Sequence, residues 1–138
     1  MVRSILLFAI CALASTVAFG QDDAAYQGYM KAVQPSFGAL RMAVMAKDTT
    51  AAAAAGTKLS ATFSEVLAYW QKKNVADAIA FATAARDAAK AISASTTIVD
   101  DPRLINALQV ASMMKLQQQC GGCHVAHRMG AAPNFMIH

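Results

Sequence analysis

The residues with the clearest chemistry lie near the end of the sequence, in Cys120-Gly121-Gly122-Cys123-His124. On one helical turn, this spacing lets two sulfur atoms form thioethers with the two vinyl groups of a haem, while the adjacent imidazole binds the iron. Gly121 and Gly122 have no side chains, so the porphyrin edge can approach the backbone closely. The motif therefore predicts a covalently attached haem c held by Cys120 and Cys123, with His124 as an axial iron ligand.

Three other kinds of site use the same residue types. A redox-active dithiol places its cysteine pair at the start of a helix that follows a strand, where the thiol pKa is lowered. A structural zinc site needs four ligands, and only His127 and His138 offer further nitrogen donors. A simple disulfide between Cys120 and Cys123 leaves His124 without a role. These alternatives stay open, and haem attachment is preferred because it explains all three motif side chains.

The first twenty residues have the pattern of a secretory signal peptide. Arg3 precedes an apolar run, and Ala18-Phe19-Gly20 forms a small-x-small cleavage site. A retained membrane anchor is the alternative, but the run is short for a membrane-spanning helix, so no stable span is expected after cleavage of residues 1–20. Cleavage also removes Cys11, which excludes a long-range disulfide within one mature chain. We expect a single exported domain of residues 21–138.

The charge of the chain is mildly basic and scattered. Twelve Lys and Arg, of which Arg3 lies in the signal segment, face eight Asp and Glu. Lys72 and Lys73 form the only adjacent pair, so the chain has no electrostatic footprint for nucleic acid and no nucleic-acid partner is expected. The sequence favours a solvated helix end for this pair over a docking face for an acidic redox partner.

The mature sequence has the periodicity of helices, and none of it alternates like a half-buried strand. A first helix has apolar residues at steps of three and four, at Tyr26, Met30, Val33, Phe37, Leu40 and Val44. A second helix over residues 51–73, capped by Thr49 or Thr50, ends near Asn74 and has Leu59, Phe63, Val66 and Trp70 on its apolar stripe.

Two further helices follow. The third is predicted over residues 75–94, with an alanine-rich inward face at Ile79, Ala82, Ala85, Ala89 and Ile92, before a polar connection over residues 93–99. Asp101-Pro102 is a strong start signal for the fourth, which continues to Arg128. Short connections predict an all-α, antiparallel up-down-up-down four-helix bundle with haem c near the C-terminal end of the fourth helix, followed by a loosely ordered tail.

Four predicted helices with the haem motif in the last one resemble the cytochrome c′ family. The specific part of the resemblance is the stretch from Cys120 to Arg128, because the family has an arginine four residues after the haem-ligating histidine. His127 departs from the family pattern, which usually has an aromatic residue at that position. The resemblance implies one haem c, export across the bacterial inner membrane to the periplasm, and a bundle type in which homodimers are common.

The resemblance also implies what happens on the second face of the iron. Either that face is open, or a methionine near the start of the first helix binds it, as in low-spin members of the family. Met30 occupies the matching place. It also lies on the apolar stripe of its helix, in the turn before Pro35, although filling the core is the usual role of methionine.

Two further residues near the motif have predicted roles. Arg128 lies four residues after His124, on the same helix face, where a guanidinium can pair with a haem propionate; an ordinary solvated arginine is the alternative. His127 shares a helix with His124 and cannot easily reach the opposite face of the ring, so a surface histidine beside a propionate is expected.

The expected function is that of an electron carrier. A mono-haem cytochrome would exchange single electrons with redox partner proteins in the periplasm, and no set of general acid, base and nucleophile indicates an enzyme. A gas-binding protein with an open iron face, taking nitric oxide or carbon monoxide, is the first alternative. A haem-free bundle that binds zinc or cycles a dithiol is the second.

Overall fold

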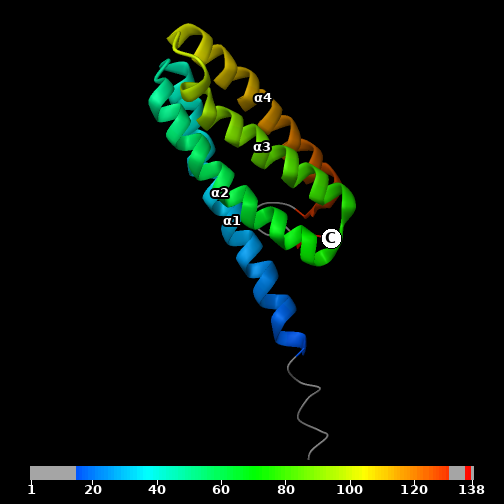
Figure 1. Cartoon of the computed structure of the whole chain (residues 1–138). Coiled ribbons are helices and arrows are strands. Elements are labelled where there is room, and N and C mark those ends of the chain that lie inside the picture. The colour runs from blue at the N-terminus through cyan, green and yellow to red at the C-terminus, as the bar shows by residue number, and fades with distance from the viewer. Residues whose placement is uncertain (1–14, 131–135, 138) are drawn as a thin grey trace, which may run out of the picture.

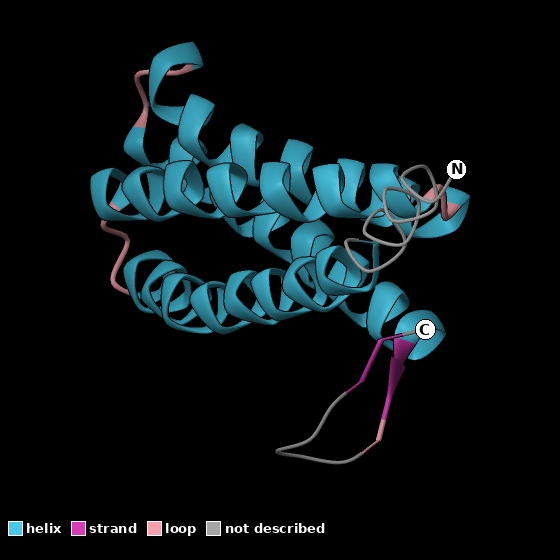
Figure 2. Cartoon of the chain, turned by 90° about the horizontal axis from the view of Figure 1, so that it is seen from below, coloured by secondary structure: helices cyan, strands magenta, loops and turns pink. Residues whose placement is uncertain are grey.

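The computed structural model describes residues 15–130 and 136–137, with side chains described from residue 22 onward. Over this part the chain forms four helices, α1 (Ser15–Met45), α2 (Thr49–Lys73), α3 (Ala76–Ile98) and α4 (Pro102–His127), and two short strands, β1 (Arg128–Met129) and β2 (Met136–Ile137). The predicted all-helical bundle of four helices is confirmed (Figures 1 and 2). Of the predicted signal segment, residues 1–14 lie outside the described residues and the remainder begins α1.

The helices do not pack equally on one another. α2 packs extensively on both α1 and α3, and α3 packs on α4, whereas α1 and α4 contact each other little. Figure 1 shows α3 and α4 side by side along the bundle, with the start of α1 extending beyond the other helices. No helix in the described part of the chain is long and apolar enough to cross a membrane. The weak α1–α4 contact leaves room for a cavity between these two helices.

The ends of the helices follow local capping chemistry, with one difference from expectation. Asp48, not Thr49 or Thr50, caps α2, because its carboxylate accepts a hydrogen bond from the Ala51 backbone N–H at 2.9 Å. A carboxylate one residue before the threonines can satisfy the same unpaired backbone donors. Asp101 caps α4 as predicted.

α3 is longer than expected and ends at Ile98 instead of residue 94. The hydroxyl groups that indicated a polar connection bond within the helix: Ser95 donates to the Ile92 carbonyl at 2.7 Å, and Thr97 donates to the Ala94 carbonyl at 2.8 Å. Hydroxyls that bond back to the preceding turn are compatible with a continuing helix, so these residues extend α3.

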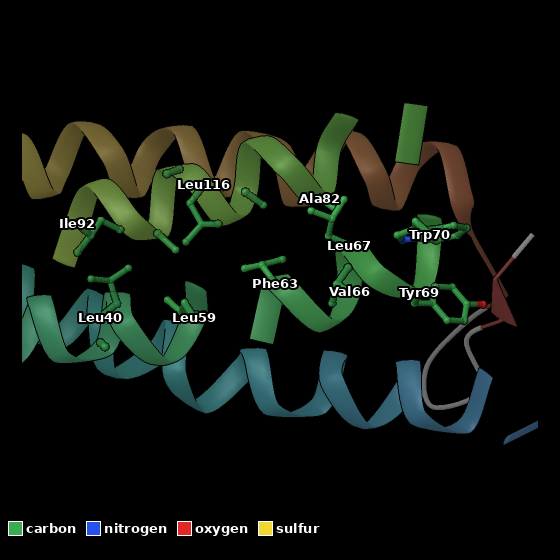
Figure 3. Close-up of a cluster of buried hydrophobic side chains, with 14 of the residues drawn as sticks. Leu40, Leu59, Phe63, Val66, Leu67, Tyr69, Trp70, Ala82, Ile92 and Leu116 are labelled. Atoms are coloured by element: carbon green, nitrogen blue, oxygen red, sulfur yellow. The ribbon is translucent and has the colours of Figure 1, made fainter. Parts of the chain in front are cut away.

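The core runs the length of the bundle (Figure 3). Figure 3 shows Ile92 and Leu40 towards one end and Tyr69 and Trp70 towards the other. The stripe predicted on α2 is buried throughout, at Leu59, Phe63, Val66 and Trp70. On α1 the stripe is buried only in part, because Met30, Val33 and Phe37 are half-buried. This incomplete burial marks the side of α1 that faces the cavity.

Candidate functional site

A cavity of about 450 Å³ lies within the bundle and receives side chains from all four helices. Its volume falls in the range of roughly 300–1,000 Å³ that is typical of ligand pockets. Apolar walls come from α2 and α3, at Phe63, Val66, Phe81, Ala82 and Ala85. An apolar hollow of this size can hold a large hydrophobic ligand away from water.

All five predicted site residues line this one cavity: Met30 from α1, Cys120, Cys123 and His124 from α4, and Arg128 just beyond it. Met30 comes from the opposite end of the sequence, so packing of α1 in the bundle is what brings it to the motif. Neither cysteine is in a disulfide, and both are half-buried. Two thiols, an imidazole and a thioether sulfur thus face a shared apolar space.

The two thiols are in an environment that keeps them protonated. Burial raises the pKa of Cys120, and it raises the pKa of Cys123 to about 11, with further contributions from Cys120 and from the carboxylate of Asp77. Catalytic dithiols have the opposite property, a lowered pKa that produces the reactive thiolate. The environment therefore does not favour a thioredoxin-like exchange reaction.

The surroundings of His124 favour its neutral form. Partial desolvation, followed by the positive charge of Arg128, holds the pKa of His124 below its usual range. The Arg128 guanidinium Nη1 lies 3.4 Å from His124 Nδ1, and its backbone N–H donates to the His124 carbonyl. A neutral imidazole is the form that ligates a metal.

Residues 136–137 lie at the cavity, in a tail for which the sequence predicts only a loosely ordered end. α4 ends at His127, one residue before the predicted end, and β1 pairs antiparallel with β2, with Arg128 opposite Ile137 and Met129 opposite Met136. Met136 and Ile137 thereby join the cavity lining. Strands of two residues are too short to leave a periodic signal in the sequence, so nothing in the pattern indicated this pairing.

His127 is not the surface residue that was expected. Only 8% of it is exposed, its Nε2 lies 3.0 Å from Asp77 Oδ2, and its ring centroid is 5.1 Å from that of Trp70. Asp77 is in the first turn of α3 and His127 is in the last turn of α4, positions where a carboxylate and a histidine also complement the helix dipoles. His127 therefore joins α4 to α3 beside the cavity.

Gly122 makes a close contact that a larger residue would prevent. A Cβ atom there would lie 2.6 Å from Cε1 of Phe81 on α3, whereas a Cβ on Gly121 would have no neighbour within 4 Å. The sequence predicts space for a porphyrin edge at both glycines. At Gly122 the Phe81 ring occupies this space, whereas at Gly121 the space is open. Phe81 sets how closely the CxxCH turn approaches α3.

We expect Gly122→Ala to disturb the site and Gly121→Ala to be tolerated. The added methyl at residue 122 must push Phe81 away, at a cost of about 1–3 kcal/mol in the free energy of unfolding, whereas the same change at residue 121 removes a poor helix former and is neutral or slightly stabilising. Chemical denaturation measures both. Phe81→Ala added to Gly122→Ala should recover part of the loss, and equal effects of the two glycine variants would contradict the assigned contact.

A group of aromatic rings closes the cavity near the start of the described part of α1. Tyr26 lines the cavity and is buried, and its ring centroid is 4.4 Å from that of Tyr69. The Tyr69 hydroxyl donates to Asp23 Oδ1 at 2.7 Å, and Lys73 Nζ lies 2.7 Å from the same oxygen. Lys72 pairs with Asp22 at 3.4 Å. The Lys72-Lys73 pair thus joins α2 to α1 through these carboxylates.

The contacts of Asp23 with Lys73 and Tyr69 are expected to make the stability of the protein depend on pH in the acid range. Hydrogen bonds from Lys73 and then from Tyr69 hold the pKa of Asp23 below its ordinary value of 3.8. A lowered folded-state pKa contributes stability that is present above the ordinary value and is lost as the pH falls through the folded-state value. Asp23→Asn should therefore lower Tm by about 2 to 5 °C at pH 6 and by less at pH 2.

Thermal unfolding followed by circular dichroism across this pH range measures the effect. Asp22→Asn is the matched control, since it removes only the longer 3.4 Å contact to Lys72 and leaves both hydrogen bonds of Asp23 in place. An Asp23→Asn profile parallel to that of the wild type from pH 6 to pH 2 would show that this carboxylate does not stabilise the bundle.

A second cavity of about 310 Å³ lies further along the gap between α1 and α4. It shares His124 and Cys120 with the first cavity and adds Phe37 and Arg41 from α1 and Gln117 from α4. Cys120 and His124 of the motif therefore border both cavities. We call the gap between α1 and α4 that holds these cavities the open seam, and it results from the weak packing between the two helices.

Among the described residues, no three side chains of His, Cys, Asp or Glu are grouped so that they could hold a metal ion by themselves. Comparisons with protein-family models, with curated proteins and with solved structures gave no match. The functional assignment therefore depends on the chemistry of the cavity itself.

Proposed function

We propose that this chain is an exported mono-haem c-type cytochrome, similar to the cytochrome c′ family, that carries single electrons between periplasmic redox proteins and catalyses no reaction. The observation that carries the proposal is the convergence of Cys120, Cys123, His124 and Met30 on one apolar cavity. When bound there, the haem would supply one-electron chemistry at its iron.

The residues of the cavity fit this cofactor. Cys120 and Cys123 would form the two thioethers, and their raised pKa values and half-buried positions are consistent with anchoring residues that do not exchange disulfides. His124, neutral and at the cavity, would ligate the iron. A zinc site on the same motif has less support, because the nitrogen of His127 is engaged with Asp77.

Met30 is the methionine best supported as the second axial ligand. Met42 and Met45, later on the same helix, are 69% and 75% exposed, and neither lines a cavity. Met114 is also exposed, on the helix that carries His124. Met30 is half-buried, borders the main cavity and comes from a different helix from His124, so the two side chains would hold the iron from separate helices.

Arg128 would pair with a haem propionate. Its guanidinium donates to the Nδ1 lone pair of His124, which requires the tautomer with a proton on Nε2. If His124 ligates iron through Nε2, the proton resides on Nδ1, which can then no longer accept a hydrogen bond. The guanidinium would be released from this contact and could bind a carboxylate of the cofactor.

The proposal also covers export and assembly. Residues 1–20 would be removed as a signal peptide, leaving residues 21–138 as one domain in the periplasm. The helices would run up-down-up-down, which is supported by connections over residues 46–48, 74–75 and 99–101 that are too short for a parallel return. Homodimerisation remains open to measurement by light scattering.

Mass spectrometry of the purified polypeptide tests the proposal. The chain would be expressed with its leader in a bacterium that contains a c-type haem maturation system. The expected result is a polypeptide that begins at residue 21 and carries the added mass of one haem that survives denaturation. An unmodified mass under conditions in which a control c-type cytochrome is matured would remove haem attachment and return the motif to the dithiol and zinc alternatives.

A further inference from the structure

The Lys, Arg, Asp and Glu side chains that line the two cavities, among the described residues, carry charge of one sign. Among the described residues, no Asp or Glu lines either cavity, whereas Lys31 and Arg128 line the first and Arg41 lines the second. The sequence of α1 after Asp23, and all of α4, contain no acidic residue. The open seam between α1 and α4 is therefore a positively charged surface on a chain whose overall charge is only mildly basic.

Asp77 lies beside the first cavity, where it pairs with His127, and several of the other acidic residues also have partners. Asp22 and Asp23 pair with Lys72 and Lys73 at the α1–α2 contact, and Asp87 pairs with its neighbour on α3. In contrast, Lys31 and Arg41 are exposed and form no ion pair with any other described residue. Lys31 and Arg41 are thus uncompensated within the described part of the chain.

Exposed apolar side chains lie at the opening of the first cavity, which Lys31 also lines. Met129 and Met136 are exposed partners across the β1–β2 pair. Met136 lines the first cavity together with Lys31, so the apolar and the charged residues border the same opening. Exposed apolar side chains next to charged ones are a usual composition of a protein-binding surface.

We propose that this surface, the docking face formed by Lys31, Arg41, Met129 and Met136, binds an acidic redox protein. The inference rests on the proposed electron-carrier function, because it names the partner chemistry at the opening of the same cavity. The cations would steer a carboxylate-rich partner to the cavity, and the apolar side chains would pack in the encounter complex. A protein is favoured over an anionic membrane, which typically selects clusters of about four to eight Lys and Arg instead of a few spaced cations.

The first experiment does not depend on haem. A glutamate-rich peptide is coupled to the mature protein with a carbodiimide at low ionic strength, and the modified lysines are mapped by mass spectrometry. Lys31 should be modified about fivefold more than Lys58 on α2 and Lys90 on α3, which are also exposed, and the preference should disappear in about 0.5 M salt. Equal modification of the three lysines, or binding to phosphatidylglycerol vesicles without peptide coupling at Lys31, would overturn the proposal.

The second experiment uses the haem-loaded protein and two small redox probes of opposite charge. Charge reversal with Lys31→Glu and Arg41→Glu should slow electron exchange with ferricyanide about tenfold and accelerate exchange with hexaammineruthenium. The control pair Lys58→Glu and Lys90→Glu should change either rate less than about twofold. Circular dichroism and haem content verify that each variant is folded and loaded with haem. Equal effects of the docking-face pair and the control pair would show that electron exchange does not take place at the docking face.

The two experiments separate the two proposals. A chain that carries no haem but couples the peptide at Lys31 would overturn the cytochrome function and keep an acidic partner for this face. A chain that carries haem but shows no preference at Lys31 and no difference between the charge pairs would keep the cytochrome function and overturn the docking face.

Discussion

Replacing both Cys120 and Cys123 with serine is expected to abolish covalent haem attachment completely. Serine has nearly the same shape but cannot form a stable thioether with a vinyl group, so the double variant should have the mass of the bare polypeptide. Because both thiols are half-buried and carry no disulfide, their loss should cost only about 1–2 kcal/mol in the free energy of unfolding, and the helices should persist. Mass spectrometry and far-ultraviolet circular dichroism measure the two effects separately.

The sequence offers a matched control in its third cysteine. Cys11→Ser changes a residue of the predicted signal segment, and the purified protein should keep full haem content and the same mass as the wild type. The single variants Cys120→Ser and Cys123→Ser should each retain at most one thioether and a lower haem yield. A double variant with wild-type covalent haem content would contradict the assignment of both cysteines.

The helices could be predicted because their signals are local. Steps of three and four apolar residues, and the Asp101-Pro102 start, depend on neighbours within one or two turns. The stripe on α2 was correct at each position for this reason. The end of α3 was wrong by four residues, because Ser95 and Thr97 suit both a connection and a helix whose hydroxyls bond back to the preceding turn.

The features that were missed depend on contacts between distant residues. The pairing of His127 with Asp77 joins positions 50 residues apart, and no local pattern on α4 distinguishes a buried histidine from an exposed one. The contact between Gly122 and Phe81 is of the same kind, as is the return of Met136 to the cavity. The motif predicts the chemistry of the site from residues adjacent in sequence, whereas the residues that surround it depend on how the helices pack.

The distinction between local sequence signals and long-range packing also applies to Met30. The resemblance placed it at the family's ligand position, and its helical stripe placed it in the core, but only the packing of α1 could bring it to the same cavity as His124. A second methionine, Met136, reaches this cavity from the tail and was not considered from the sequence. A test of the iron ligand must therefore separate these two methionines.

Met30→Ala is expected to convert the reduced protein from a low-spin to a high-spin absorption spectrum while leaving haem covalently bound. Loss of the thioether sulfur removes a ligand that stabilises reduced iron, so the reduction potential should also fall. Truncating a half-buried methionine should cost about 1–3 kcal/mol in the free energy of unfolding. Absorption spectroscopy, potentiometric titration and denaturation measure the three effects.

Two other methionine variants make the result specific. Met42→Ala lies on the same helix, is 69% exposed and borders neither cavity, so it should leave the spectrum unchanged. Met136→Ala should also leave it unchanged, and a change there together with a silent Met30→Ala would move the ligand to the tail. A wild-type protein that is already high-spin when reduced would show that Met30 lines the cavity without binding the iron. Binding of nitric oxide or carbon monoxide would then be the better-supported function, because no side chain would compete for the iron.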